Sequence, residues 1–154
     1  LLTRLDARRS ELAPYHEHLR AQLRAALNGD GRAAYAAAAQ AAALAPDSRA
    51  AYDAAIFALW LGWADSARSR LERVSPDRGA MIGWPSYWTN LAHARHLTGA
   101  HDLELRAARE MRARHPAARV AWVLEARALA ALRDTLALET LLREADRLDP
   151  DVYW

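Results

Sequence analysis

The sequence predicts an all-α protein, built as a solenoid of about four helix-turn-helix repeats, and three observations predict this fold class. Alanine, the best helix former, supplies 38 of the 154 residues. Sustained alternation of apolar and polar residues, the pattern typical of strands, is missing, and β-branched residues are few. Proline and glycine recur in alternation along the chain, at intervals that are typical of helical repeats.

The prolines and the turn residues divide each repeat in two. Four segments end alike, at Leu44-Ala45-Pro46, Val74-Ser75-Pro76, Arg114-His115-Pro116 and Leu148-Asp149-Pro150, with their prolines 30, 40 and 34 residues apart. Turn signals lie between them at Gly29, Gly62, Gly99 and Arg133, which are 33, 37 and 34 residues apart. Glycine suits the residue after a helix end, and proline cannot continue a helix. Each period is therefore helix, turn, helix, stop.

Two helices are expected in each repeat, in the following order. They span 14–27 and 32–44 in the first repeat (14–46), 48–61 and 64–74 in the second (47–76), 86–97 and 102–114 in the third (84–116), and 118–132 and 135–148 in the fourth (117–150). Ser48 and Ser86 suit helix N-termini. Trp122, Ala126 and Leu129 form an apolar stripe with the helical period. We expect one repeat domain over residues 1–154, with a linker at 77–85.

The repeats resemble the tetratricopeptide (TPR) family. Residues 85–118 carry Trp88, Leu91, Ala92 and Gly99 where that family has a large residue, Leu, a small residue and Gly, and residues 119–152 carry Trp122, Ala126, Leu129, Ala145 and Pro150. The resemblance implies a right-handed solenoid that binds partners in a concave groove lined by the first helix of each repeat. Three residues depart from the family pattern, namely Arg95, Glu125, and Glu104 where Ala is expected.

The resemblance also assigns roles to individual residues. Positions that face the groove in the family are occupied here by Tyr52, Ile56, Thr89, His93, His96 and Arg127. Trp88 and Trp122 are expected to fill the wedges between repeats, where loss of either side chain would destabilise the fold. The linker carries Met81, Ile82 and Trp84, which either close the seam between repeats or form an exposed hot spot, and we favour the seam.

Motifs for catalysis are missing from the sequence. There is no cysteine, no serine-nucleophile motif and no glycine-rich phosphate loop, so an enzyme is not expected. His93 and His96, three residues apart on one helical face, could share a metal ion with His101 or Asp102 as the third ligand. Because exposed histidines are ordinary on solenoid helices, we expect no metal and no cofactor.

Composition narrows the class of partner. The formal net charge is +2, and the acids are interleaved with the 21 basic residues, so a nucleic-acid partner is not favoured. All basic residues are arginine, which together with the alanine content indicates a GC-rich, bacterial genome. No apolar run is long enough to span a membrane, and we expect a cytoplasmic protein.

The function expected from these observations is a protein- or peptide-binding scaffold. The alternatives are a regulatory sensor domain for a small ligand or nucleic acid, and a structural subunit of a larger complex. Residues 73–88 echo residues 4–16, which suggests that residues 1–13 are the end of a preceding repeat or a cap, in an array of the kind found beside signalling or regulatory domains. The identity of the partner and the oligomeric state are not encoded in any recognisable motif.

Overall fold

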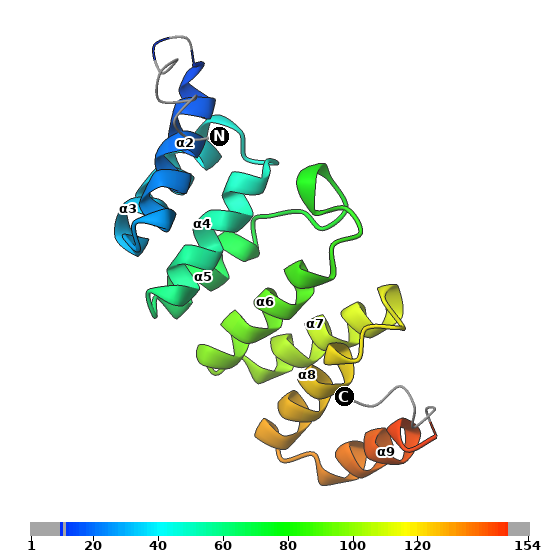
Figure 1. Cartoon of the computed structure of the whole chain (residues 1–154). Coiled ribbons are helices and arrows are strands. Elements are labelled where there is room, and N and C mark those ends of the chain that lie inside the picture. The colour runs from blue at the N-terminus through cyan, green and yellow to red at the C-terminus, as the bar shows by residue number, and fades with distance from the viewer. Residues whose placement is uncertain (1–9, 11, 148–154) are drawn as a thin grey trace. The chain divides into compact units, whose positions relative to one another are not determined.

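The computed structural model describes residues 10 and 12–147, and in this part of the chain all regular structure is helical (Figure 1). The α-helices are α2 (Pro14–Leu27), α3 (Gly31–Leu44), α4 (Arg49–Trp60), α5 (Ala64–Leu71), α6 (Pro85–Leu97), α7 (His101–Arg114), α8 (Val120–Ala131) and α9 (Thr135–Ala145). The 3₁₀ helix η2 (Gly79–Met81) lies in the predicted linker. The all-α prediction is confirmed. The predicted cap at 1–13 falls mostly outside the described residues. The last helix, predicted to run over 135–148, ends at Ala145, and residues 146 and 147 form a turn.

The chain forms two compact units, residues 1–87 and 88–154, with the division inside α6 after Tyr87. In the first unit α2 packs on α3, α3 on α4, and α4 on α5. In the second unit α7 packs on α8 and α8 on α9. Within each unit, these helices thus pack against their neighbours in the chain. None of the helices in the described part of the chain has both the length and the apolar character needed to cross a membrane.

Four turns between helices share one backbone feature. Gly29, Gly62, Gly99 and Arg133 each have a positive φ, between 59° and 77°. The next helix begins two residues after each of these left-handed residues. Asp30 and Asp134 cap α3 and α9, since their side chains accept hydrogen bonds from Ala33 N (2.9 Å) and Ala137 N (3.0 Å). The left-handed residue lies where the sequence predicts each turn. Only Arg133 among them carries a side chain, in a conformation that L-residues rarely adopt.

The core of the first unit consists largely of alanine and a few aromatic side chains. Ala34, Ala38 and Ala54 are fully buried and pack with Phe57, while Tyr35 covers the cluster from α3. Small residues let these helices approach closely, since a methyl group leaves little between two helix backbones. The packing therefore follows from the alanine content that the sequence shows.

The linker closes against the first unit. Met81 is buried, and the Trp84 ring lies 5.3 Å from the Tyr52 ring and 4.5 Å from the Arg49 guanidinium carbon. A Cβ at Gly79 would collide with the carbonyl oxygen of Asp47, so this contact requires glycine. Ile82, by contrast, is exposed. Two of the three large linker residues therefore pack inward.

Candidate functional site

A buried carboxylate organises the centre of the second unit. Glu104, in the first turn of α7, is 0% exposed. A buried carboxylate is costly unless charged or hydrogen-bonded groups surround it. The groups around Glu104 come from three helices: His96 from the last turn of α6, His101 from the start of α7, and Arg127 from α8.

The two oxygens of Glu104 have separate partners. Arg127 Nε donates to Oε1 at 2.6 Å. His96 Nδ1 and His101 Nδ1 lie 2.9 and 3.1 Å from Oε2, and the two imidazole rings have their centroids 5.2 Å apart. One oxygen therefore meets a permanent cation, and the other meets two imidazole nitrogens.

The pKa of Glu104 reflects two opposed influences. Burial raises it, but the hydrogen bonds from His101, His96 and Arg127, together with the charge of Arg127, lower the pKa below its ordinary value. Glu104 is thus ionised at neutral pH. An ionised carboxylate only accepts hydrogen bonds, so each Nδ1 that contacts it must carry a proton.

The turn between α6 and α7 holds the two histidines at this spacing. Thr98 Oγ1 donates to Ala94 O at 3.0 Å, and Arg95 donates across the turn to Leu103 O at 2.9 Å. Gly99 takes the left-handed conformation that reverses the chain. As a result, residues five apart in the sequence direct their rings toward the same oxygen.

His96, His101 and Glu104 could together hold a metal ion. Their ligating atoms all lie within 4.8 Å of one another. Imidazole nitrogen and carboxylate oxygen are ligands that Zn²⁺ and related ions accept. The grouping differs from the pair that the sequence suggested, because His93 is not part of it and the third ligand is Glu104 rather than Asp102.

His93 is exposed on α6 and lies in the field of the same cluster. Partial removal of the His93 ring from water lowers its pKa, and the nearby charges of Arg127 and His96 lower the pKa further, while the charge of Glu104 raises it. The net shift is downward. A pH response through His93 is therefore expected below the ordinary imidazole range rather than centred on it.

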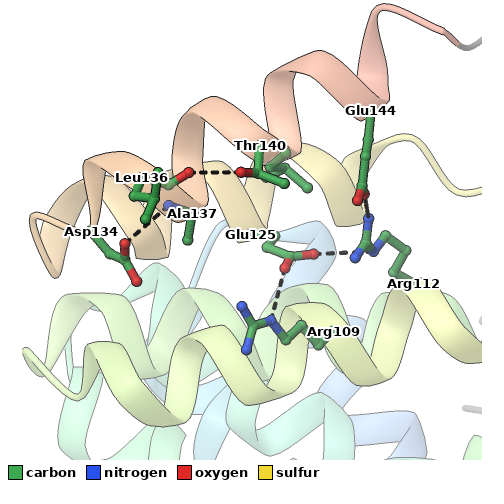
Figure 2. A pocket seen from close by; sticks show the side chains of 9 residues that line it. Arg109, Arg112, Glu125, Asp134, Leu136, Ala137, Thr140 and Glu144 are labelled. Atoms are coloured by element: carbon green, nitrogen blue, oxygen red, sulfur yellow. Dashed lines mark hydrogen bonds and ion pairs between the residues drawn. The ribbon is translucent and has the colours of Figure 1, made fainter.

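A second buried carboxylate borders a groove formed by α7, α8 and α9 (Figure 2). Glu125 on α8 is 2% exposed, and its Oε1 accepts a hydrogen bond from Arg109 Nε at 2.8 Å. Arg112 Nε lies 3.1 Å from Oε2 in an ion pair that lacks hydrogen-bond geometry, and Arg112 also contacts Glu144 at 3.2 Å. The groove has a volume of about 410 Å³, and its charged lining consists of two arginines and three carboxylates.

The structure distributes the predicted groove residues differently from the family pattern. Tyr52 is 5% exposed, and its hydroxyl donates to Ser86 O at 3.4 Å, so it lies in the core of the first unit. Ile56 of that unit is half-buried. Replacing Tyr52 with alanine is therefore expected to destabilise the fold, rather than to remove only a partner contact.

The other predicted groove residues belong to the second unit. His96 and Arg127 meet at Glu104, whereas His93 remains outside this cluster. Thr89 is half-buried, and its hydroxyl contacts Met111 Sδ at 3.6 Å. Arg127 in addition reaches Ala92 O at 3.4 Å. Within this unit, three of the predicted residues, Thr89, His96 and Arg127, are held by contacts inside the protein.

The two tryptophans expected between repeats are half-buried and lie beneath arginines. The Arg114 guanidinium carbon is 5.2 Å from the Trp88 ring, and that of Arg112 is 4.4 Å from the Trp122 ring. Each pair is in the range of a cation–π contact. Their role as wedges between repeats remains a prediction.

Sequence reasoning did not assign a role to Glu104 or Glu125, although it singled out both as departures from the repeat pattern. Both are buried charges. Arg95, the third departure, donates a hydrogen bond across the turn between α6 and α7 to Leu103 O. A glutamate at a position where the repeat pattern has Ala or Leu was therefore the usable signal, because burying it requires partners elsewhere in the chain.

Large apolar side chains remain exposed at the ends of four helices, one of them α3, whose last residue Leu44 is 55% exposed. Leu27, Trp60 and Leu97 are the last residues of α2, α4 and α6, and are 73%, 75% and 51% exposed. Leu23 is also exposed, one turn before Leu27 on the same face of α2.

Comparison with known proteins gives no family assignment. No protein-family model matches the chain, and no curated protein matches it.

Proposed function

We propose that this chain is a TPR-like array of helical hairpins that acts as a protein- or peptide-binding scaffold and is not an enzyme. In this proposal the first helix of each hairpin (α2, α4, α6 and α8) presents the binding surface. The proposal rests on the stacking contacts within each unit and, above all, on the exposed apolar residues at corresponding helix ends.

Side-chain hydrogen bonds one repeat length apart support the repeat assignment. Gln22 Nε2 donates to Asp53 at 2.9 Å and so joins α2 to α4. Arg70 Nη2 donates to Tyr35 at 2.8 Å and joins α5 to α3. In the second unit, the contact of Arg112 with Glu144 joins α7 to α9. These pairs are 31, 35 and 32 residues apart and connect like helices, as stacked hairpins would.

The exposed helix ends carry the functional part of the proposal. When the turn residues Gly29, Gly62 and Gly99 are aligned, Leu27, Trp60 and Leu97 occupy the same position, two residues before each turn. Single exposed apolar residues are common on protein surfaces. Leu27 and Trp60 both lie in the first unit, and a large apolar residue at the same place in two successive hairpins is what a repeated contact with an extended partner requires. Trp is among the residue types that are enriched at binding hot spots.

Selection from a displayed peptide library on the purified chain would test this proposal. Binding of the selected peptides is then measured for a variant with Leu23→Ser, Leu27→Ser and Trp60→Ser. The matched control carries Leu44→Ser and Ile82→Ser, which lie in the same unit and are also exposed, but not on a first helix. We expect the first variant to weaken binding by about 1–3 kcal/mol for each hot-spot residue, and the control to bind normally.

Three outcomes would contradict the proposal. One is that no peptide is enriched, and another is that the control loses binding as much as the first-helix variant. The third is binding to nucleic acid that falls steeply with salt concentration, which would favour the sensor alternative.

A further inference from the structure

We propose that His96, His101 and Glu104 form a binding site for a divalent transition-metal ion, of which Zn²⁺ is the best match. The site lies at the turn between α6 and α7 in the second unit. It is independent of the proposed scaffold function, since neither needs the other.

The positions of the donor atoms support this proposal. His96 Nδ1 and His101 Nδ1 lie 2.9 and 3.1 Å from Glu104 Oε2, and the three ligating atoms all lie within 4.8 Å of one another. Ligands that are each about 2.0–2.2 Å from one tetrahedral zinc ion lie about 3.3–3.6 Å apart, so the three donor atoms need only small shifts to share an ion. An ion could thus be bound with small rotations of side chains and without movement of the helices.

Arg127 orients the Glu104 carboxylate without itself being a metal ligand. Because it donates to Oε1 at 2.6 Å, it fixes the carboxylate in a direction that leaves Oε2 facing the two rings. Carboxylates that bind metals are commonly oriented by such outer hydrogen bonds. The Arg127 cation alone balances the charge of Glu104, so neutralisation does not by itself explain why two imidazoles also converge on Oε2.

Access and burial also suit a metal ion. Glu104 is fully buried, whereas the two histidine side chains are about one-third exposed, at 32% and 28%. An ion can therefore enter from solvent between the rings. Each neutral imidazole would bind through Nδ1 and carry its proton on Nε2, so the ring changes tautomer without a net loss of a proton.

The chemistry of the donors selects the class of ion. Two imidazoles and one carboxylate favour Zn²⁺, Cu²⁺ or Ni²⁺ over Ca²⁺ and Mg²⁺, which prefer oxygen ligands. Three protein ligands leave at least one coordination position for water or for a donor from a partner. Where that position is filled by a partner, the metal would join the two proteins.

Calorimetric titration of the chelator-treated chain with Zn²⁺ tests the proposal, and Co²⁺ serves as a spectroscopic probe. We expect saturable binding of a single ion per chain, and visible Co²⁺ bands with intensities typical of a low-coordinate site. His101→Gln removes one ligand at a partly exposed position. It is expected to weaken binding at least about 100-fold, because loss of an outer-sphere partner alone costs about 10–100-fold.

His93→Gln is the matched control, because His93 lies on the same helix as His96 but is not in the cluster. It should bind Zn²⁺ like the natural chain. Equal Zn²⁺ affinity of the natural chain, His101→Gln and His93→Gln would overturn the proposal. So would a natural chain that shows native circular dichroism but no saturable Zn²⁺ binding. If His101→Gln fails to fold, ring resonances in NMR decide the matter: Zn²⁺ must shift those of His96 and His101, and a shift elsewhere only would reject the site.

Discussion

The two units of this protein bury different residues at corresponding places in their hairpins. Ala34 and Ala67 in the first unit and Glu104 in the second each lie five residues after the left-handed turn residue, and all three are fully buried. An alanine at this position needs no partner, whereas a glutamate needs every group that surrounds Glu104. The comparison shows that one backbone arrangement accepts a buried charge when neighbouring helices supply its partners.

Glu125 extends the contrast. It lies eight residues before Arg133, and Ala54 lies eight residues before the corresponding Gly62. Ala54 is fully buried in the apolar cluster of the first unit, while Glu125 is held by Arg109 and Arg112. The first unit is thus stabilised mainly by close apolar packing, and the second also depends on specific charge pairs, which cost more to disrupt singly.

The largest effect is expected where a charge is placed in the unit that lacks partners for it. Ala34→Glu buries a carboxylate in a cluster of alanine and aromatic side chains, and should lower the free energy of unfolding by at least about 4 kcal/mol. Urea unfolding followed by circular dichroism measures the loss. Ala36→Glu, at an exposed position of the same helix, is the control and should be nearly neutral. Similar, small losses for both variants would show that the first unit tolerates buried charge.

The reverse change removes the charge from the second unit. Glu104→Ala leaves Arg127 and two histidines without their acceptor, and should lower the free energy of unfolding by about 3 kcal/mol. The double variant Glu104→Ala/Arg127→Ala should lose less free energy of unfolding than the sum of the losses of the two single variants, because the two residues are directly paired. Strict additivity of the changes would argue against the pairing.

The pH dependence of stability should differ between the natural chain and Glu104→Gln. The folded-state pKa of Glu104 is lower than its unfolded value, so its contribution is fully present above the unfolded pKa of about 4.3 and is lost as the pH falls through the folded pKa. The difference in Tm between the two proteins should therefore be constant near neutrality and shrink below about pH 4. A difference that grew on acidification would reverse the assigned sign.

Glu125→Gln is expected to have a smaller effect. The side chain of Arg109 is 54% exposed and can turn to solvent when its partner is neutral, so we expect a loss of about 1–2 kcal/mol. Chemical unfolding of Glu125→Gln and of Glu104→Gln shows which of the two variants loses more free energy of unfolding. A greater loss for Glu125→Gln would show that the groove of Figure 2, rather than the Glu104 cluster, is the main electrostatic centre of the second unit.

The smallest effect concerns the turns. Arg133 has φ of 59° where the other three turns have glycine, so Arg133→Gly should raise the free energy of unfolding by about 0.5–1 kcal/mol. Gly62→Arg, the opposite change in the first unit, should lower it by a similar amount. Thermal unfolding of both variants checks the prediction, which fails if Arg133→Gly is destabilising.

The helices and their turns could be predicted from local features of the sequence. Alanine content, the helical period and the placement of Gly and Pro are local properties, and they located α2, α3 and α7 to within a residue at each end. The positions of the turns followed from the same signals, including the turn at Leu132-Arg133-Asp134. These features are governed by backbone preferences that act over a few residues.

The contacts of the unusual residues, by contrast, depend on how the helices pack and could not be predicted from the sequence. The partners of Glu104 lie at positions 96, 101 and 127, and no local pattern relates these positions to one another. Tyr52 was assigned to a groove by its place in the repeat, but the linker residue Trp84 folds back over it. Burial and pairing depend on which helices pack together, and that arrangement is set by contacts between residues far apart in the chain rather than by the preferences of any single segment.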